Sequence, residues 1–318
     1  GTWIFPVEPS IRLVGDTIEY CAEHAPKYSP VSVCGYHIRE SGANPAQEMA
    51  YAFCIAKAYA DDVIKRGLAV DEFAGRLSYN FNIFGNLFEQ VAKFRAGRGL
   101  WAKIMKEQYG AEKPGSMWLR MIAAGGGGGL TFEQPEVNIV RTTVQALAAV
   151  LGGTQSLHTN SLDEALALPS EHAVTIALRT QQIIAEESGV TNTVDPLGGS
   201  FFVEALTDRM EKEAYDYFRR VEEMGGVIPA IEKGFFQSEI SDAAYRYQRE
   251  IDRGIRKIVG VNAYAEKKPL TIPILEMDPQ GYQRQVKRLE DLLARQHLAV
   301  SVFERRDRNV SFVAMALF

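Results

Sequence analysis

Residues 31–67 read VSVCGYHIRESGANPAQEMAYAFCIAKAYADDVIKRG and contain one complete strand-and-helix unit. The short β-branched run Val31–Gly35 predicts a strand that ends at a glycine. Asn44 is then a suitable N-cap, Pro45 fits the first helical position, and Gln47 completes a capping box. A glycine at the end of the stretch supplies the helix stop. The pattern therefore predicts a strand followed by a long helix.

The same unit recurs toward the C-terminus. Strand-like runs occur at RLSYNF (Arg76–Phe81), SMWLRMI (Ser116–Ile122) and TQSLHTN (Thr154–Asn160), each followed by a helical pattern. After the SMWLRMI run, a helix is marked by an apolar stripe at Val137, Val140, Val144, Leu147 and Leu151. Strand starts recur about every 40 residues, and strands that alternate with helices predict a parallel sheet.

The number of units indicates half of a barrel. A (β/α)8 TIM barrel takes about 250 residues, and only about half of its units are recognisable here. GDTIEYCAEHAP (Gly15–Pro26) is typical of a helix whose own strand would precede residue 1. We therefore predict an α/β fold in which residues 1–197 form the second half of a (β/α)8 barrel. Charged amphipathic patterns predict a helical extension over residues 198–318, with a β-rich tail from residue 297.

Composition excludes several classes of protein. The net charge of -5 and the pI near 5.7 argue against nucleic acid as the partner. Cys21, Cys34 and Cys54 lack metal-binding or disulfide spacing, so we interpret them as reduced and expect no metal site. No apolar run approaches the roughly 20 residues of a membrane span, and no signal peptide is visible. The sequence predicts a cytoplasmic protein or a piece of one, with no membrane partner.

Polar residues near the predicted strand ends are the candidates for function, because parallel βα folds bind ligands beyond the carboxyl ends of their strands. These candidates are Tyr36, His37, Arg39 and Glu40 after the first strand, Arg76 and Ser78 on the second, and His158, Thr159, Asn160, Asp163 and Glu164 at the fourth. No nucleophile with an adjacent base is recognisable among them. Such a set favours chemistry done by a cofactor.

The chain resembles the adenosylcobalamin-dependent acyl-CoA mutases, the methylmalonyl-CoA mutase family. The resemblance is carried, in the family's order, by IFPVEPS, GYHIRESGA, FAGRLS, VAKFRAGRGLWAKIM, GGTQSLHTNSLDEALALP, EESGVTNTVDPLGGS and IVGVN. It implies an isomerase that performs a radical carbon-skeleton rearrangement of an acyl-CoA of the methylmalonyl-CoA/succinyl-CoA type. It also implies that coenzyme A runs through the centre of the barrel and that adenosylcobalamin, held by a separate Rossmann-like domain or subunit, caps the mouth.

The same resemblance implies roles for individual residues. His37 would be the catalytic residue that hydrogen-bonds the substrate thioester carbonyl, with Tyr36 as its aromatic neighbour near the cofactor. Lys27, Arg76 and Ser78 match contacts to coenzyme A. The cofactor side would be formed by Glu40, His158, Asn160 and Glu164, of which the carboxylates and the amide suit the hydroxyls of the adenosyl ribose.

The stretch MIAAGGGGGL (Met121–Leu130) departs from the family pattern. Relatives usually carry a histidine and a glutamine where Ile122 and Ala124 stand, and a short polar segment in place of the glycines. A phosphate-binding loop is disfavoured because GxxxxGK[ST] is absent, and a linker is disfavoured because matching sequence resumes at LTFEQP. A backbone anion nest stays open. We interpret the segment as a degraded strand end that faces the cofactor.

Three family features lie outside the chain: the cobalamin domain with its DxHxxG motif, the upstream half of the barrel, and the arginine that binds a substrate carboxylate. We therefore expect an acyl-CoA substrate, a cobalamin-binding partner and an upstream half-barrel, with assembly into an oligomer and no turnover by the chain alone. Two alternatives remain open. One is a non-catalytic partner or assembly subunit that keeps the barrel surface, and the other is a phosphate-binding barrel that uses the glycines.

Overall fold

The computed structural model describes residues 5–267 and 271–295. The chain divides into two compact units, Gly1–Ile274 and Leu275–Phe318, which are described separately. The β-rich stretch predicted from residue 297 lies outside the described residues. The predicted boundary between residues 197 and 198 falls inside the first unit and stays a prediction.

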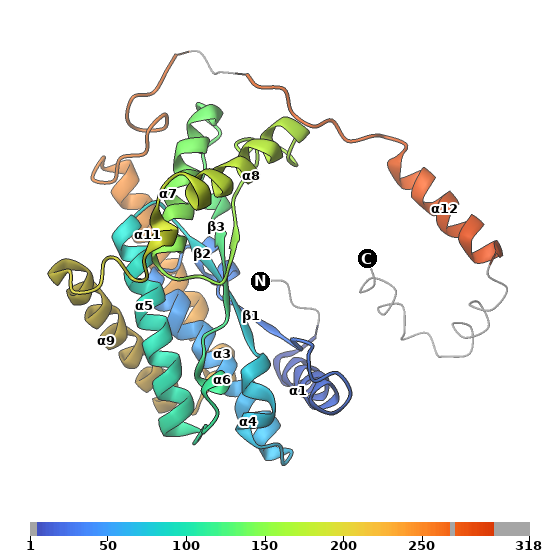
Figure 1. The fold of residues 1–318 in the computed structure, drawn as a ribbon, viewed down its shortest axis with the longest axis vertical. Helices are drawn as coiled ribbons and strands as arrows, with labels where there is room; N and C mark the ends of the chain where they lie inside the picture. Colours follow the sequence, from blue (N-terminus) through green and yellow to red (C-terminus); the bar gives the residue numbers. More distant parts are fainter. Residues whose placement is uncertain (1–4, 268–270, 296–318) are drawn as a thin grey trace. The chain divides into compact units, whose positions relative to one another are not determined.

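A four-stranded parallel sheet forms the centre of the first unit (Figure 1). Its strands, in spatial order, are β1 (Ser32–Cys34), β2 (Ser78–Ile83), β3 (Met121–Gly125) and β4 (Ser156–His158). Each strand pairs with the one before it in the chain. Because βα crossovers are right-handed, this order brings the connecting helices to one face of the sheet.

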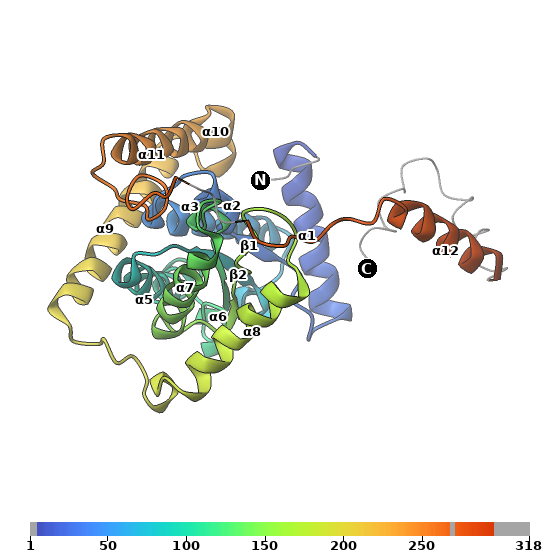
Figure 2. The same cartoon turned by 90° about the horizontal axis from the view of Figure 1, so that it is seen from above.

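Figure 2 shows three of these helices on one side of the strands: α3 (Pro45–Lys65), α5 (Leu87–Lys103) and α7 (Asn138–Leu151). Sequential parallel strands with helices on a single face are the arrangement found in part of a (β/α)8 barrel, which confirms the predicted fold class. The opposite face is the one that lines the interior of such a barrel.

The remaining helices surround this layer. In the first unit they are α1 (Val7–His24), α2 (Tyr36–Glu40), α4 (Val70–Phe73), α6 (Pro114–Met117), α8 (Glu171–Glu186), α9 (Phe201–Glu223), α10 (Val227–Glu232) and α11 (Phe235–Asp252). Helix α9 packs along α3 and α5, so the predicted helical extension contacts the helix layer. The second unit contains α12 (Gly281–Arg295), which lies inside the range predicted as a helical extension.

The capping box predicted for α3 is confirmed. The Asn44 side chain accepts a hydrogen bond from the Gln47 backbone N–H, and the Gln47 side chain accepts one from the Asn44 N–H. Gly67, just beyond the helix, has a φ of 103°, a backbone conformation that glycine adopts at little cost. These local signals define both ends of the longest barrel helix.

One sequence prediction was wrong in detail. The third strand begins at Met121 rather than Ser116, because Pro114 starts the short helix α6 there. The helix predicted after it is confirmed as α7, although Val140 of its apolar stripe is 62% exposed. The buried residues of α7 combine three alanines with polar side chains, of which Asn138 bonds the backbone of the loops above the sheet.

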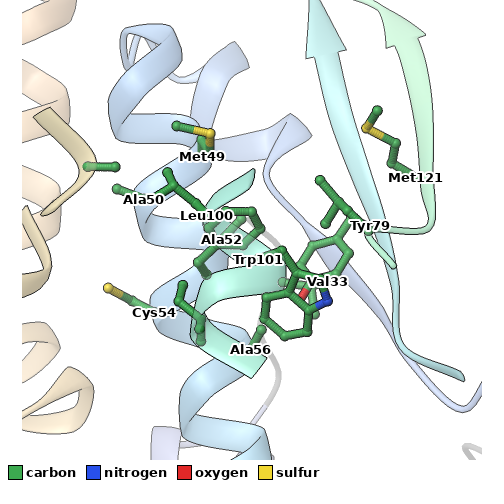
Figure 3. Packing of buried hydrophobic residues seen from close by; sticks show 14 of the residues in the cluster. Val33, Met49, Ala50, Ala52, Cys54, Ala56, Tyr79, Leu100, Trp101 and Met121 are labelled. Carbon is green, nitrogen blue, oxygen red and sulfur yellow. The ribbon is translucent and has the colours of Figure 1, made fainter. Parts of the chain in front are cut away.

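The helix-covered face of the sheet carries the core. On β2, Tyr79, Phe81 and Ile83 alternate onto this face and are buried. Tyr79 packs edge-on against Phe53 and Trp101, and Figure 3 shows Tyr79 beside the Trp101 indole. These aromatic contacts hold α3 and α5 against the strands.

A buried ion pair lies at the carboxyl end of β2. Lys93 Nζ on α5 lies 2.7 Å from Glu48 Oε2 on α3, and both side chains are almost completely buried. Glu48 also accepts a hydrogen bond from the Asn82 backbone N–H (2.6 Å), and Lys93 donates one to the Asn82 carbonyl (2.5 Å). Burial lowers the pKa of Lys93 and raises that of Glu48, and each partner's charge opposes the other's shift. The pair therefore anchors the backbone of β2 to two helices.

We expect Lys93→Met to lower the free energy of unfolding by about 3–5 kcal/mol, because Glu48 would be left as a buried charge without its partner. Lys103→Met on the same helix is the matched control. Lys103 pairs with Glu211 at 2.8 Å but is half exposed, so its loss should cost at most about 1 kcal/mol. Urea unfolding of the two variants measures the difference, and equal losses would contradict a structural role for the buried pair.

Candidate functional site

The face of the sheet opposite the helices is polar and carries small side chains. In register, one row across the strands contains Cys34, Asn80, Ile122 and Ser156, and the next row toward the carboxyl ends contains Asn82, Ala124 and His158. A face of this kind is poorly suited to covering by an apolar helix, because its polar groups would lose hydrogen bonds to water. It suits a passage for an extended polar ligand.

Five of the predicted residues gather at the carboxyl end of the sheet: Tyr36, Glu40, His158, Asn160 and Glu164. Burial raises the pKa of the Tyr36 hydroxyl, and the Glu40 carboxylate raises it further. Burial also raises the pKa of Glu164, while His158 opposes that shift. Two carboxylates, a phenol and an imidazole therefore share one partly buried space.

His37 lies at the same end, in α2, which begins two residues after β1. Its ring meets the Tyr36 ring edge-on, with the centroids 5.6 Å apart and an interplanar angle of 90°. The imidazole is exposed, whereas Tyr36 beside it is partly buried. This arrangement leaves His37 accessible to a ligand above the sheet.

Glu40 is held on both carboxylate oxygens. Its Oε1 accepts a hydrogen bond from Asn82 Nδ2 (2.5 Å), and its Oε2 accepts one from the Gly128 backbone N–H (3.0 Å). Gly128 belongs to the turn Gly127–Gly129, which follows β3. The glycine segment thus lies directly against a predicted site residue.

Asn160 and Glu164 carry polar atoms that have no partner among the described residues. Asn160 is 2% exposed, and neither its Oδ1 nor its Nδ2 is hydrogen-bonded; the same holds for Glu164 Oε2. Buried polar atoms in proteins are nearly always paired, so such atoms at a mouth fit a ligand with hydroxyl groups. The residues present therefore fit the ribose of an adenosyl group.

Lys27, Arg76 and Ser78 lie elsewhere. Arg76 precedes β2 and Ser78 is its first residue, so both stand at the amino end of the strand, and their placement at the mouth was wrong. The predicted strand already began at Arg76, so the error lay in grouping its first polar residues with residues that follow the carboxyl ends of the other strands. Ser29, close to the exposed Lys27, donates to the Arg76 carbonyl and the Ser78 hydroxyl, which brings this loop to the same end.

A groove of about 610 Å³ runs over the amino end of the inner face. Its polar lining includes Ser32, Ser78, Arg120, Gln155 and Ser156. Sequence analysis did not select Arg120, because it lies before a strand whose start was misplaced. The six residues of β2 separate this end from the mouth by on the order of 17 Å.

Three further candidates have structural roles. Arg39 is buried, donates to the Ala43 carbonyl, and stacks its guanidinium 4.1 Å from the Phe84 ring centroid. Thr159 and Asp163 bond backbone groups of the α8 region. These contacts use part of the hydrogen-bonding capacity of the three side chains, while Arg39 Nε and Asp163 Oδ1 have no partner among the described residues.

The described ranges 5–267 and 271–295 contain one further hollow of note. A hollow of about 820 Å³ lies between α1, α3, α10 and α11, is lined mostly by apolar side chains, and includes none of the predicted site residues. No cluster of three or more His, Cys, Asp or Glu side chains there could hold a metal ion. No helix in this part of the chain is long and apolar enough to cross a membrane.

A known protein family matches most of this chain. The model of the methylmalonyl-CoA mutase family matches residues 1–301. The chain belongs to this family. It is similar to the 2-hydroxyisobutanoyl-CoA mutase large subunit of Aquincola tertiaricarbonis, with 48% identity over 287 residues that cover 90% of this chain and 51% of that protein.

Two further members are named methylmalonyl-CoA mutase. The Cereibacter sphaeroides protein is 46% identical over 295 residues, covering 92% of this chain and 42% of that protein. The human mitochondrial protein is 42% identical over 293 residues, which cover 92% of this chain and 39% of that protein. The chain thus spans about half the length, or less, of the curated relatives that it matches. All three named relatives are acyl-CoA mutases, enzymes of the isomerase class.

We expect Glu164→Gln to stabilise the fold at neutral pH. The folded-state pKa of Glu164 is raised, chiefly by burial, so its protonated form is favoured in the fold. The protonated carboxyl group therefore stabilises the fold. This stabilisation is complete below the unfolded-state pKa of Glu164 and is lost as the pH rises through its folded-state pKa. Thermal denaturation should show a higher Tm for the variant at pH 7 and a smaller difference at pH 4. A gain that is equal at both pH values would contradict the assignment.

Proposed function

We propose that this chain forms part of the catalytic subunit of an adenosylcobalamin-dependent acyl-CoA mutase. The observation that carries the proposal is the separation of two groups of residues along one polar sheet face. Candidate coenzyme A contacts lie at the amino end, and His37 with the carboxylate cluster lies at the carboxyl end. An acyl-CoA that ran through the barrel with its nucleotide at the amino end would bring its thioester to the mouth.

The charges and donors at the amino end support this direction of binding. Arg76 and Lys27 are cationic, and Ser78 offers a hydroxyl beside the groove. Arginine and lysine are the usual partners of phosphate groups. In a chain of net charge -5, a local cationic group of this kind is what an anionic nucleotide tail requires.

At the mouth, His37 donates a hydrogen bond to the thioester carbonyl and Tyr36 packs beside it. Glu40, His158, Asn160 and Glu164 form the side that receives the adenosyl group. Adenosylcobalamin, when bound, supplies the radical chemistry of the rearrangement. The protein's own groups orient the thioester and shield the reacting carbons from water.

Two edges of the sheet support an upstream half-barrel as partner. β1 and β4 are the outer strands of the sheet, and along the described residues neither pairs with a further strand. Beside β4, Val174 and Leu178 of α8 are 41% and 56% exposed. Closure of a barrel would pair the free backbone N–H and C=O groups of both edge strands and would cover these side chains. A cobalamin-binding partner, oligomeric assembly and a cytoplasmic location remain predictions.

The direct test is turnover by the complete protein or complex in which this chain occurs. With adenosylcobalamin and either methylmalonyl-CoA or 2-hydroxyisobutyryl-CoA, we expect isomerisation, and we expect none from this chain alone. Absence of turnover in the complete assembly with every acyl-CoA tried, together with normal folding, would favour a non-catalytic assembly subunit instead.

In that assembly, His37→Ala should lower kcat more than it raises KM, because its hydrogen bond is most valuable while charge redistributes on the thioester. Loss of one oriented donor in acyl transfer costs about 2.7–4 kcal/mol, and a radical step, which develops less charge, should lie at or below the lower end. Arg76→Ala is the contrast and should raise KM with kcat almost unchanged. Steady-state kinetics separate the two. A His37→Ala variant with normal kcat and a lowered Tm would identify a packing residue.

A further inference from the structure

The Glu40 carboxylate is held by a hydrogen bond on each of its two oxygens. Asn82 and the Gly128 N–H each occupy one of its oxygens. A carboxylate offers about four lone-pair sites, so two acceptors remain for a ligand. Two acceptors in a set orientation suit a vicinal diol, the group that a ribose presents.

Asn82 is itself fixed from behind the sheet. It is completely buried, and its backbone N–H and carbonyl are bonded by Glu48 and Lys93. The position of its side chain therefore depends on an ion pair that does not touch the mouth. Any shift of that pair would move Asn82 and, through Asn82 Nδ2, the Glu40 carboxylate.

Gly126 leaves the space in which this contact forms. A Cβ at this position would overlap Asn82 Oδ1 and stand 2.8 Å from Glu40 Oε1. Its φ is -74° and its ψ is 123°, values that any residue adopts, so the need for glycine here is steric and not conformational. At Gly127 the nearest atom to an added Cβ is Glu40 Oε2 at 3.7 Å, an ordinary contact.

We propose that Gly126, Asn82 and the buried Lys93–Glu48 pair position the Glu40 carboxylate to bind the ribose diol of the adenosyl group. Gly126 is then a requirement of this site and not part of a degraded strand end. The identity of the ligand rests on the proposed function, whereas the positioning of Glu40 does not. Gly126, Asn82, Lys93 and Glu48 are positioning residues, since each acts through Glu40.

The test compares Gly126→Ala with the matched control Gly127→Ala in the complete protein or complex. Each variant is titrated with adenosylcobalamin and with hydroxocobalamin, which has the same corrin but lacks the adenosyl group. Gly126→Ala should weaken adenosylcobalamin binding about tenfold, the usual effect of losing a hydrogen bond to a charged group, and leave hydroxocobalamin binding unchanged. Gly127→Ala should change neither. Equal weakening of both cobalamins by Gly126→Ala, no weakening, or the same loss from Gly127→Ala would overturn the proposal.

A second measurement needs no ligand. Hydrogen exchange of the segment 121–130, in the same assembly without cobalamin, reports on the Gly128 N–H that Glu40 accepts. Gly126→Ala should accelerate exchange there about tenfold, while Gly127→Ala should not. Unchanged exchange would overturn the positioning of Glu40 even if the mutase function stands. Failure of the unsubstituted assembly to bind adenosylcobalamin, with the exchange result as expected, would overturn only the function and the ligand.

Discussion

The buried pair Lys93–Glu48 is the interaction on which the rest of the site depends. Two charges removed from water are costly, and this pair offsets the cost by bonding each other and both backbone groups of Asn82. Since every bond involves a group that would otherwise be buried without a partner, the arrangement tolerates little movement. The end of β2 is thereby held to α3 and α5 at the height where the mouth begins.

Alternation along the strands gives the sheet two different faces. On β2, Tyr79, Phe81 and Ile83 belong to the aromatic core, while the intervening Ser78, Asn80 and Asn82 face the other way. The first face requires a layer of helices, and the second requires polar surroundings. The two groups of candidate residues lie at opposite ends of the sheet, Arg76 and Ser78 at the amino end and the carboxylates at the carboxyl end, because all four strands point in one direction.

The glycine segment shows how a departure from a family pattern can be accommodated. Where the resemblance leads one to expect polar side chains, the chain has bare backbone, and a backbone N–H of Gly128 bonds Glu40 instead. The space left by Gly126 is filled by Asn82. Buried amides nearby, those of Gln145 and Asn160, have no partner among the described residues, and they mark the part of the mouth where further hydrogen bonds remain to be made.

The sequence by itself determined the class of fold, the family, and the ends of α3, because strand alternation, capping residues and long motifs are local signals. It also indicated residues that lie at the mouth, except that it placed Arg76 and Ser78 at the wrong end and included Arg39, which is buried. The first error did not come from the strand limits, since the predicted strand already began at Arg76; it came from grouping residues at the start of β2 with residues that follow the other strands. Only the tertiary structure decided that Lys93 meets Glu48 across 45 residues of sequence and that Asn82 joins them to Glu40. Contacts between side chains on different elements depend on packing distances that no local pattern encodes.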